Sequence, residues 1–235
     1  MKLKVHIVIF FHLFFMSLIS GCALMGINER APTVSDLIDI PLTPFHWQVV
    51  YGQPGNIKFQ YLQSKDLYLQ SEVEPAANKT SAALLVLNYG MQKPFRNFIL
   101  EVEATTVKQF RPHLKNDWEV FWLFTNYRIG KDEKKETNYF LAKPNSGVEL
   151  GKAFSEVGQT FLSTKENQSF SLGKKMKYLF VKNDHQYTVY LNDRRAINYY
   201  HQSGDMKIYD HAGTVGLYVE DAAVVVHRVG IKILD

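Results

Sequence analysis

Residues 178–200 read YLFVKNDHQYTVYLNDRRAINYY. Three short runs rich in aromatic and β-branched residues, 178–181, 187–191 and 196–200, are separated by the polar clusters Asn183-Asp184-His185 and Asn192-Asp193-Arg194. Runs of this composition predict β-strands, and short Asn/Asp clusters between them predict tight hairpin turns. The stretch therefore predicts three consecutive antiparallel strands.

The same pattern extends outward in both directions. Further runs with alternating or continuous apolar character lie at 47–51, 57–62, 67–70, 82–87, 98–104, 118–127, 138–142, 215–219 and 224–234. No long amphipathic helix interrupts them. Such short strands at regular spacing predict an all-β protein in which two antiparallel sheets stack face to face, as in a jelly-roll sandwich.

The first residues have the pattern of an export signal. Lys2 and Lys4 precede an apolar segment, Val5 to Ile19, which is too short to be a comfortable transmembrane helix. The segment ends in Leu18-Ile19-Ser20-Gly21-Cys22. Residues 1–21 are therefore predicted to be a signal peptide.

That ending resembles the lipobox of bacterial lipoproteins, in which small residues precede a cysteine. The resemblance implies cleavage before Cys22, diacylation of its thiol and acylation, for example with palmitate, of the new amine. Cys22 is the single cysteine of the chain, and an exported protein with one free thiol would be unusual. Ala23 in place of Asp resembles the outer-membrane sorting signal of Gram-negative bacteria. The expected location is the cell envelope, lipid-anchored in the outer membrane.

The mature chain divides into a tether and one domain. Residues 22–44 carry Pro32, Pro41 and Pro44 and predict a lipidated tether, in which residues 33–40 could form one helical turn after a Ser-Asp cap. Residues 45–235 are predicted to be a single β-sandwich domain, since sandwiches often reach this size. The chain has 27 Lys and Arg against 23 Asp and Glu, and cleavage removes two of the lysines. This balance argues against nucleic acid as a partner.

Three stretches in the second half resemble the concanavalin A-like jelly-roll superfamily. They are the apolar strand 120–124, similar to one in laminarinase-type glucanases, the strand and turn 187–193, and the strand pair 213–231. The pair is especially similar to the domains called 3-keto-disaccharide hydrolase or DUF1080. The resemblance spans about residues 95–235 and implies a fold more than a function.

Retaining glucanases of this superfamily carry Glu-x-Asp-x-x-Glu on one strand, which supplies two carboxylates about 5 Å apart. The corresponding stretch here has Glu136, Asn138 and Leu141 at the three acid positions. Leucine cannot donate a proton, so this pattern argues against a glucanase of that type. The sequence leaves open whether the protein is an enzyme of another kind.

Two groups of residues are candidate ligand-binding sites. Trp118, Trp122 and Asn126 are separated by even steps, which predicts one shared strand face where aromatic rings and an amide could bind a sugar. The alternative is that the tryptophans fill the core. Tyr139, Lys143 and Glu149 cluster around the predicted turn 143–147 and could line a groove for an acidic sugar, or form a solvated loop.

No metal or cofactor is predicted. The histidines are scattered without His-x-His or Glu-x-x-His spacing, and no Asp-rich loop argues for calcium. The leading hypothesis is a membrane-anchored lipoprotein that binds a glycan without cleaving it. The alternatives are a DUF1080-like hydrolase or, less favoured, a polysaccharide lyase, and a structural envelope component that binds a protein partner.

Overall fold

The computed structural model describes residues 29–52, 55–71, 80–88, 93–111, 115–130, 133–155, 158–166, 168, 170–200 and 208–235. The predicted signal peptide, residues 1–21, and the predicted lipidation site, Cys22, lie outside these residues. No helix among the described residues has the length and apolar character needed to span a bilayer.

Nearly all of the regular secondary structure among the described residues is β-strand. One 3-10 turn, η1 (Tyr61–Gln63), accompanies the strands. The strands are β1 (Ile38–Asp39), β2 (Trp47–Tyr51), β3 (Ile57–Phe59), β4 (Leu67–Gln70), β5 (Ala82–Leu87), β6 (Phe98–Gln109), β7 (Phe121–Ile129), β8 (Lys135–Lys143), β9 (Gly147–Phe154), β10 (Gly158–Lys165), β11 (Met176–Asn183), β12 (Gln186–Leu191), β13 (Arg194–Tyr200), β14 (Thr214–Glu220) and β15 (Ala222–Ile233).

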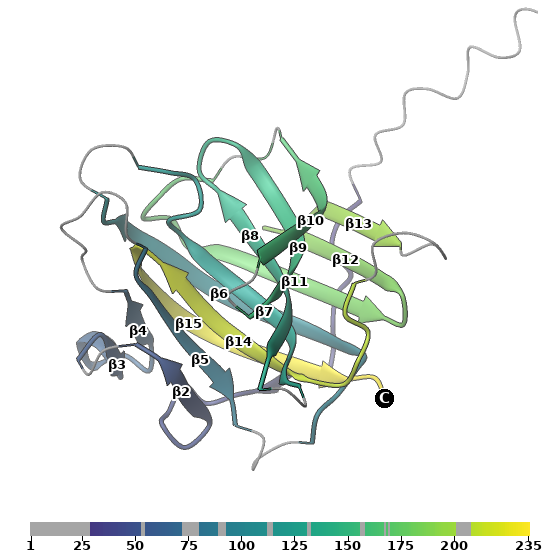
Figure 1. The fold of residues 1–235 in the computed structure, drawn as a ribbon, viewed down its shortest axis with the longest axis horizontal. Coiled ribbons are helices and arrows are strands. Elements are labelled where there is room, and N and C mark those ends of the chain that lie inside the picture. Colours follow the sequence, from purple (N-terminus) through teal and green to yellow (C-terminus); the bar gives the residue numbers. More distant parts are fainter. Residues whose placement is uncertain are drawn as a thin grey trace, which may run out of the picture.

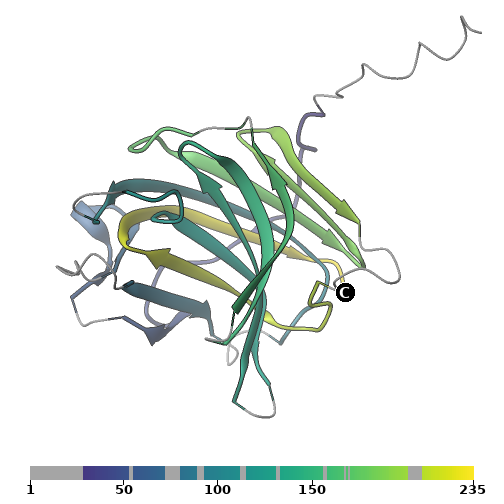
Figure 2. The ribbon, with the colours of Figure 1, turned by 45° about the horizontal axis from the view of Figure 1, so that its top comes forward.

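These strands form two antiparallel sheets that stack face to face (Figures 1 and 2). Sheet A has the spatial order β13-β12-β11-β6-β15-β4-β3, and β1 pairs with β15. Sheet B has the order β10-β9-β8-β7-β14-β5-β2. The predicted all-β sandwich of two antiparallel sheets is confirmed.

The hydrophobic core lies between the sheets. In β7, Phe121 points inward and its ring meets Tyr178 of β11 with 5.5 Å between ring centroids. In β8, Phe140 meets Phe180 of β11 at 5.2 Å. All four side chains are at most 2% exposed. Because each fully buried large apolar side chain contributes about 1.5–3 kcal/mol, these inward faces hold the sheets together.

The three-strand stretch that opened the sequence forms β11, β12 and β13 at one edge of sheet A. Its turns need residues that tolerate positive φ, and Asp184, Asn192 and Asp193 adopt φ of 48°, 46° and 65°. Asparagine and aspartate accept this conformation more readily than other side chains. The predicted hairpin turns are therefore confirmed.

Residues 29–44, here called the N-terminal strap, lie against sheet A. In Figure 1 this purple segment passes behind β11 and β12 on its way to β2. Ile38 pairs with Ile231 of β15, and the Ile40 N–H donates to the Val229 carbonyl at 2.8 Å. The helical turn predicted for residues 33–40 is wrong, because the backbone here pairs with the end of β15 instead of with itself.

Candidate functional site

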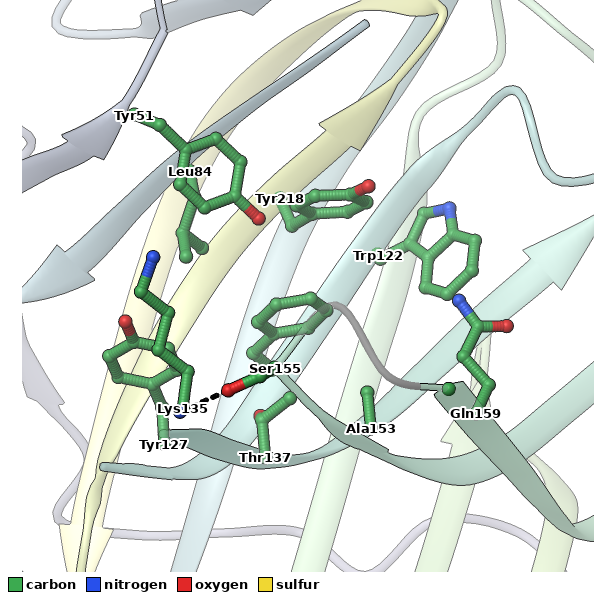
Figure 3. Close-up of a pocket in the computed structure, with 12 residues that line it drawn as sticks. Tyr51, Leu84, Trp122, Tyr127, Lys135, Thr137, Ala153, Ser155, Gln159 and Tyr218 are labelled. Atoms are coloured by element: carbon green, nitrogen blue, oxygen red, sulfur yellow. Dashed lines mark hydrogen bonds between the residues drawn. The ribbon is translucent and has the colours of Figure 1, made fainter. Parts of the chain in front are cut away.

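A cavity of about 230 Å³ opens on the outer face of sheet B. Strand β7 explains its position: Phe121 and Leu123 point into the core, so Trp122 and Phe124 point to the opposite face. Figure 3 shows the side chains around this cavity, which come from both halves of sheet B. The lining residues are Tyr51, Leu84, Trp122, Phe124, Tyr127, Lys135, Thr137, Ala153, Ser155, Gly158, Gln159 and Tyr218.

Aromatic rings form one wall of the cavity. Tyr218 of β14 is centred in this group: its ring stacks on Phe124 at 4.9 Å and meets Trp122 edge-on at 5.4 Å. Tyr51 of β2 approaches Tyr218 from the other side at 6.2 Å. The rings are held by strand pairing, since Tyr218 lies directly across from Trp122 in the β7–β14 register. The indole N–H of Trp122 donates to the Trp118 carbonyl at 2.9 Å, which fixes the ring orientation.

Polar groups also line the cavity. The Lys135 ammonium is 5.6 Å from the centroid of the Tyr51 ring, a cation–π distance. The Lys135 backbone N–H donates to the Ser155 hydroxyl at 2.9 Å, the bond drawn in Figure 3. Gln159 is exposed at the cavity mouth. The cavity therefore combines apolar ring surfaces with a cation and hydrogen-bonding groups.

A carboxyl group lies beside the aromatic wall, on the same face of β14 as Tyr218. The Tyr218 hydroxyl donates to Glu220 Oε2 at 3.0 Å. Burial raises the pKa of Glu220 to about 7, and the neighbouring Asp221 and Glu119 add to this shift, whereas the Tyr218 hydrogen bond and Arg111 oppose it. Burial also raises the pKa of Tyr218. Near neutral pH, Glu220 therefore exchanges a proton next to the ring that lines the cavity.

Four of the six ligand-binding residues predicted from the sequence come together beside this cavity. The Tyr139 hydroxyl donates to Glu149 Oε1 at 2.8 Å, and the Lys143 ammonium donates to Glu149 Oε2 at 3.1 Å. The same ammonium lies 5.3 Å from the centroid of the Trp118 ring. Burial, followed by the Glu149 charge, raises the pKa of Tyr139.

This group is closed to solvent except at Trp118. Tyr139, Glu149 and Lys143 are 0%, 1% and 8% exposed, and Trp118 is 37% exposed. The Tyr139 ring covers Gly151 of β9, where an added Cβ would lie 2.4 Å from the ring. The two Glu149 oxygens are both bonded within the group. In this arrangement the group joins β8 to β9 and supports the Trp118 ring. A sugar could reach only the solvent-exposed side of Trp118, because the other three side chains are buried.

Trp122, the fifth predicted residue, lines the cavity but is only 2% exposed. It touches the ring of Tyr139 at 5.0 Å and so connects the cavity with the buried group.

The prediction that Asn126 shares a face with Trp118 and Trp122 is wrong. The two tryptophans do lie on the same outer face of sheet B, where Trp118 contacts Lys143 and Trp122 contacts Tyr139. Trp118 precedes β7 in a turn, because the Asn116 side chain accepts the Trp118 N–H at 2.9 Å. Asn126 sits in a β-bulge with φ of 52°, where alternation is broken. Its Oδ1 accepts the Tyr187 hydroxyl of sheet A at 2.5 Å. Asn126 therefore lies between the sheets, away from the cavity.

Sequence reasoning missed Tyr51, Lys135, Gln159 and Tyr218. Tyr218 alone carried a signal, because it alternates with the apolar Leu217 and Val219 and so had to leave the core. The others depend on strand register across sheet B, which the sequence does not display. Among the described residues, no group of three His, Cys, Asp or Glu side chains is placed to hold a metal ion.

The sequence matches no known family model and no curated protein. The fold, in contrast, is shared with several solved structures. The carbohydrate-binding module CBM66 from Bacillus subtilis has 16% identity and a TM-score of 0.54, with 80% of this chain and 95% of that chain covered. The laminarinase from Flavobacterium sp. UMI-01 has 10% identity and a TM-score of 0.55, with 83% and 99% covered. The β-glucanase from Bacillus licheniformis has 11% identity and a TM-score of 0.54, with 85% and 99% covered.

The described domain is a concanavalin A-like jelly roll. The part of the predicted resemblance that concerns the fold is therefore confirmed. At such low identity these likenesses establish the fold alone, and the function has to be argued from the cavity on sheet B.

Proposed function

We propose that this protein is an envelope lipoprotein whose jelly-roll domain binds carbohydrate in the cavity on the outer face of sheet B. The observation that carries the proposal is a cavity in which the aromatic rings of Tyr51, Tyr218, Phe124 and Trp122 are combined with polar groups. Aromatic faces pack against the C–H faces of sugar rings, and the polar groups bond their hydroxyls.

The size of the cavity limits the ligand. Its volume of about 230 Å³ is below the ~300–1,000 Å³ of sites that enclose drug-sized molecules. We therefore expect one sugar ring, such as a chain end or a branch, to enter the cavity. The rest of a glycan would extend past the exposed Gln159.

The charge of the cavity favours an acidic sugar. Among its described lining residues Lys135 is the one with a formal charge, and its ammonium rests on the Tyr51 ring. A sugar carboxylate could pair with this ammonium while the sugar ring packs on the aromatic wall. We expect tighter binding of uronate-containing glycans than of neutral ones.

The side chains that line the cavity favour binding of a glycan without its cleavage. The described lining residues include no Asp or Glu, whereas glycoside hydrolysis needs two carboxyl groups about 5–9.5 Å apart. The names of the similar structures include both a carbohydrate-binding module and glucanases, which supports a carbohydrate ligand without deciding between binding and hydrolysis. A DUF1080-like hydrolase or a lyase is the enzymatic alternative, and a protein partner is the third.

The test is a glycan array and calorimetry with residues 22–235 carrying Cys22→Ser, so that the chain is soluble. Tyr51→Ala removes a half-buried ring from the cavity wall. Phe161→Ala is the matched control, because Phe161 is an aromatic side chain of the same sheet that is 53% exposed and does not line the cavity. We expect Tyr51→Ala to weaken binding about tenfold, since stacking of this kind contributes about 0.5–1.5 kcal/mol beyond buried area.

The outcomes separate the alternatives. Equal loss of binding in both variants, or no binding to any glycan, would argue against the cavity as a carbohydrate-binding site and favour a protein partner. Release of reducing ends or unsaturated products from a bound glycan would replace the binding proposal with an enzymatic one.

The membrane anchor is a separate part of the proposal and rests on the lipobox resemblance at Cys22. We expect the full chain to incorporate a palmitate analogue when expressed in a Gram-negative host and to fractionate with the outer membrane. Cys22→Ser should abolish incorporation. A Cys22→Ser chain that still labels, or a full chain that does not, would contradict lipidation at this residue.

A further inference from the structure

The N-terminal strap fastens the start of the described chain to one edge of sheet A. The Ala31 N–H donates to the Asp193 carbonyl at 2.9 Å, and the Arg195 N–H donates to the Glu29 carbonyl at 3.0 Å. The Glu29 carboxylate also pairs with the Arg195 guanidinium. The strap therefore begins at the turn between β12 and β13.

From there the strap crosses sheet A on the face opposite the core. Its residues 30–37 border a polar hollow together with Glu101, Lys177 and Arg228 of three successive strands of the sheet. Arg228 bonds Asp39 of the strap at 2.8 Å, and Leu42 is 7% exposed at the far end. The strap is thus part of the folded domain, on the side opposite the cavity of sheet B.

The attachment leaves little chain between the domain and the lipid that the proposed function places on Cys22. Six residues, 23–28, separate Cys22 from Glu29. At a maximum of about 3.6 Å per residue, the lipidated residue lies within about 25 Å of Glu29. The β12–β13 edge of sheet A must therefore stay close to the membrane surface.

The carboxylates at this edge, Glu29 and Asp193, pair with Arg195 and Lys177, so the further basic side chains here suit a phospholipid surface. Arg30 and Arg194 face each other in a backbone bridge, and both side chains are exposed. Exposed basic side chains within a Debye length of an anionic membrane are attracted to it. Two guanidinium groups thus stand where the chain leaves the domain toward the anchor.

We infer that the strap face of sheet A, centred on Arg30 and Arg194, docks on an anionic phospholipid surface, and that this holds the cavity of sheet B open toward the compartment away from the membrane. The inference rests on lipidation at Cys22, which is part of the proposed function. Docking of this face gives the domain a defined orientation on the membrane, which the lipid anchor alone does not impose.

The experiment uses the full lipidated chain on vesicles containing lipids with a quenching group at the headgroup. Because Cys22 is the single cysteine and is consumed by acylation, one introduced cysteine can be labelled with a fluorophore. Thr33→Cys labels the exposed outer side of the strap, and Gln159→Cys labels the mouth of the cavity. Both native side chains are exposed, so neither substitution disturbs the core.

We expect the label at residue 33 to be quenched several-fold more strongly than the label at residue 159 on vesicles with phosphatidylglycerol. Replacing both arginines, Arg30→Gln with Arg194→Gln, should reduce this difference, and pure phosphatidylcholine vesicles should do the same. Equal quenching at the two positions, or stronger quenching at residue 159, would overturn the orientation while leaving the anchor intact. A chain that does not float with vesicles at all would overturn the anchor and the orientation with it.

Discussion

Glu149 has both carboxylate oxygens bonded, one by the Tyr139 hydroxyl and one by the Lys143 ammonium. A buried ion pair of this kind contributes little net stability, but removal of one partner leaves the other charge without compensation. The sequence predicts that these three residues cluster around the turn at 143–147, and their side chains do meet, but they form neither the predicted groove lining nor the alternative solvated loop because they are buried. Their lack of solvent contact could not be predicted, because it depends on the Tyr139 ring folding over Gly151 on the neighbouring strand.

We expect Glu149→Gln to lower the free energy of unfolding by about 3 kcal/mol, because the Lys143 ammonium stays buried with a neutral partner. The double variant Glu149→Leu with Lys143→Met should lose less than this single variant, since no charge remains. Urea denaturation measures both, with the exposed Glu166→Gln as control. A double variant that loses more than the single one would mean that the pair itself stabilises the fold.

Glu220 should make the stability of the fold depend on pH. Burial raises its pKa in the folded state to about 7 from an ordinary value of 4.5. Between these two pH values the folded state holds a proton that the unfolded state has released, so stability falls as pH rises through this window. Glu220→Gln removes this dependence and keeps an acceptor for the Tyr218 hydroxyl.

We therefore expect Glu220→Gln to be more stable than the wild type by about 3 kcal/mol at pH 8, and to differ little from it at pH 4.5. Urea denaturation of both proteins across this range gives the difference, in which other titrating groups cancel. A constant difference between the two curves at every pH would be incompatible with a raised Glu220 pKa.

At the scale of elements, short periodic strands are predictable and their irregularities are not. The runs at 67–70 and 82–87 coincide with β4 and β5, because their apolar faces are buried in the sandwich. Strand β7 starts later than the run at 118–127, since Asn116 forms a turn with Trp118. The bulge at Asn126 lies against Gly213 of the neighbouring segment, where an added Cβ would lie 2.5 Å from the Asn126 backbone, so this close approach requires glycine. Such contacts join distant parts of the sequence and leave no local pattern.

The N-terminal strap should contribute to the stability of the domain. A chain that begins at residue 45 loses the buried Leu42 and the Pro41 carbonyl that accepts the Trp47 indole N–H at 3.2 Å. We expect its free energy of unfolding to be about 3 kcal/mol lower than that of a chain that begins at residue 29, from lost apolar burial and an unpaired indole. Urea denaturation of the two chains measures the difference. Equal stability would show that the strap rests on the domain without supporting it.

At the scale of the whole molecule, the two sheets enclose one continuous core. The number and spacing of the strands are enough to predict the sandwich architecture. They do not predict the cavity wall, because Tyr51, Trp122 and Tyr218 are brought together only by the strand order β7-β14-β5-β2. That order is a property of long-range pairing. The sequence therefore predicts the fold and the grouping of Tyr139, Lys143 and Glu149, but neither the burial of that group nor most of the cavity wall.

A single core predicts a single unfolding transition. In urea, we expect tryptophan fluorescence, which reports on Trp47 and Trp122 in sheet B, and far-ultraviolet circular dichroism, which reports on both sheets, to give the same midpoint. Residues 29–235 provide the chain for this measurement. Two separated midpoints would show that the sheets unfold independently.

The position of β15 has a consequence for synthesis of the chain. This last strand lies in the middle of sheet A, between β6 and β4, and also pairs with β1. Sheet A therefore cannot close until β15 has been synthesised. During synthesis β4 and β6, which flank β15 in the sheet, exist before the strand that joins them. Each of them has one unpaired edge until β15 enters between them.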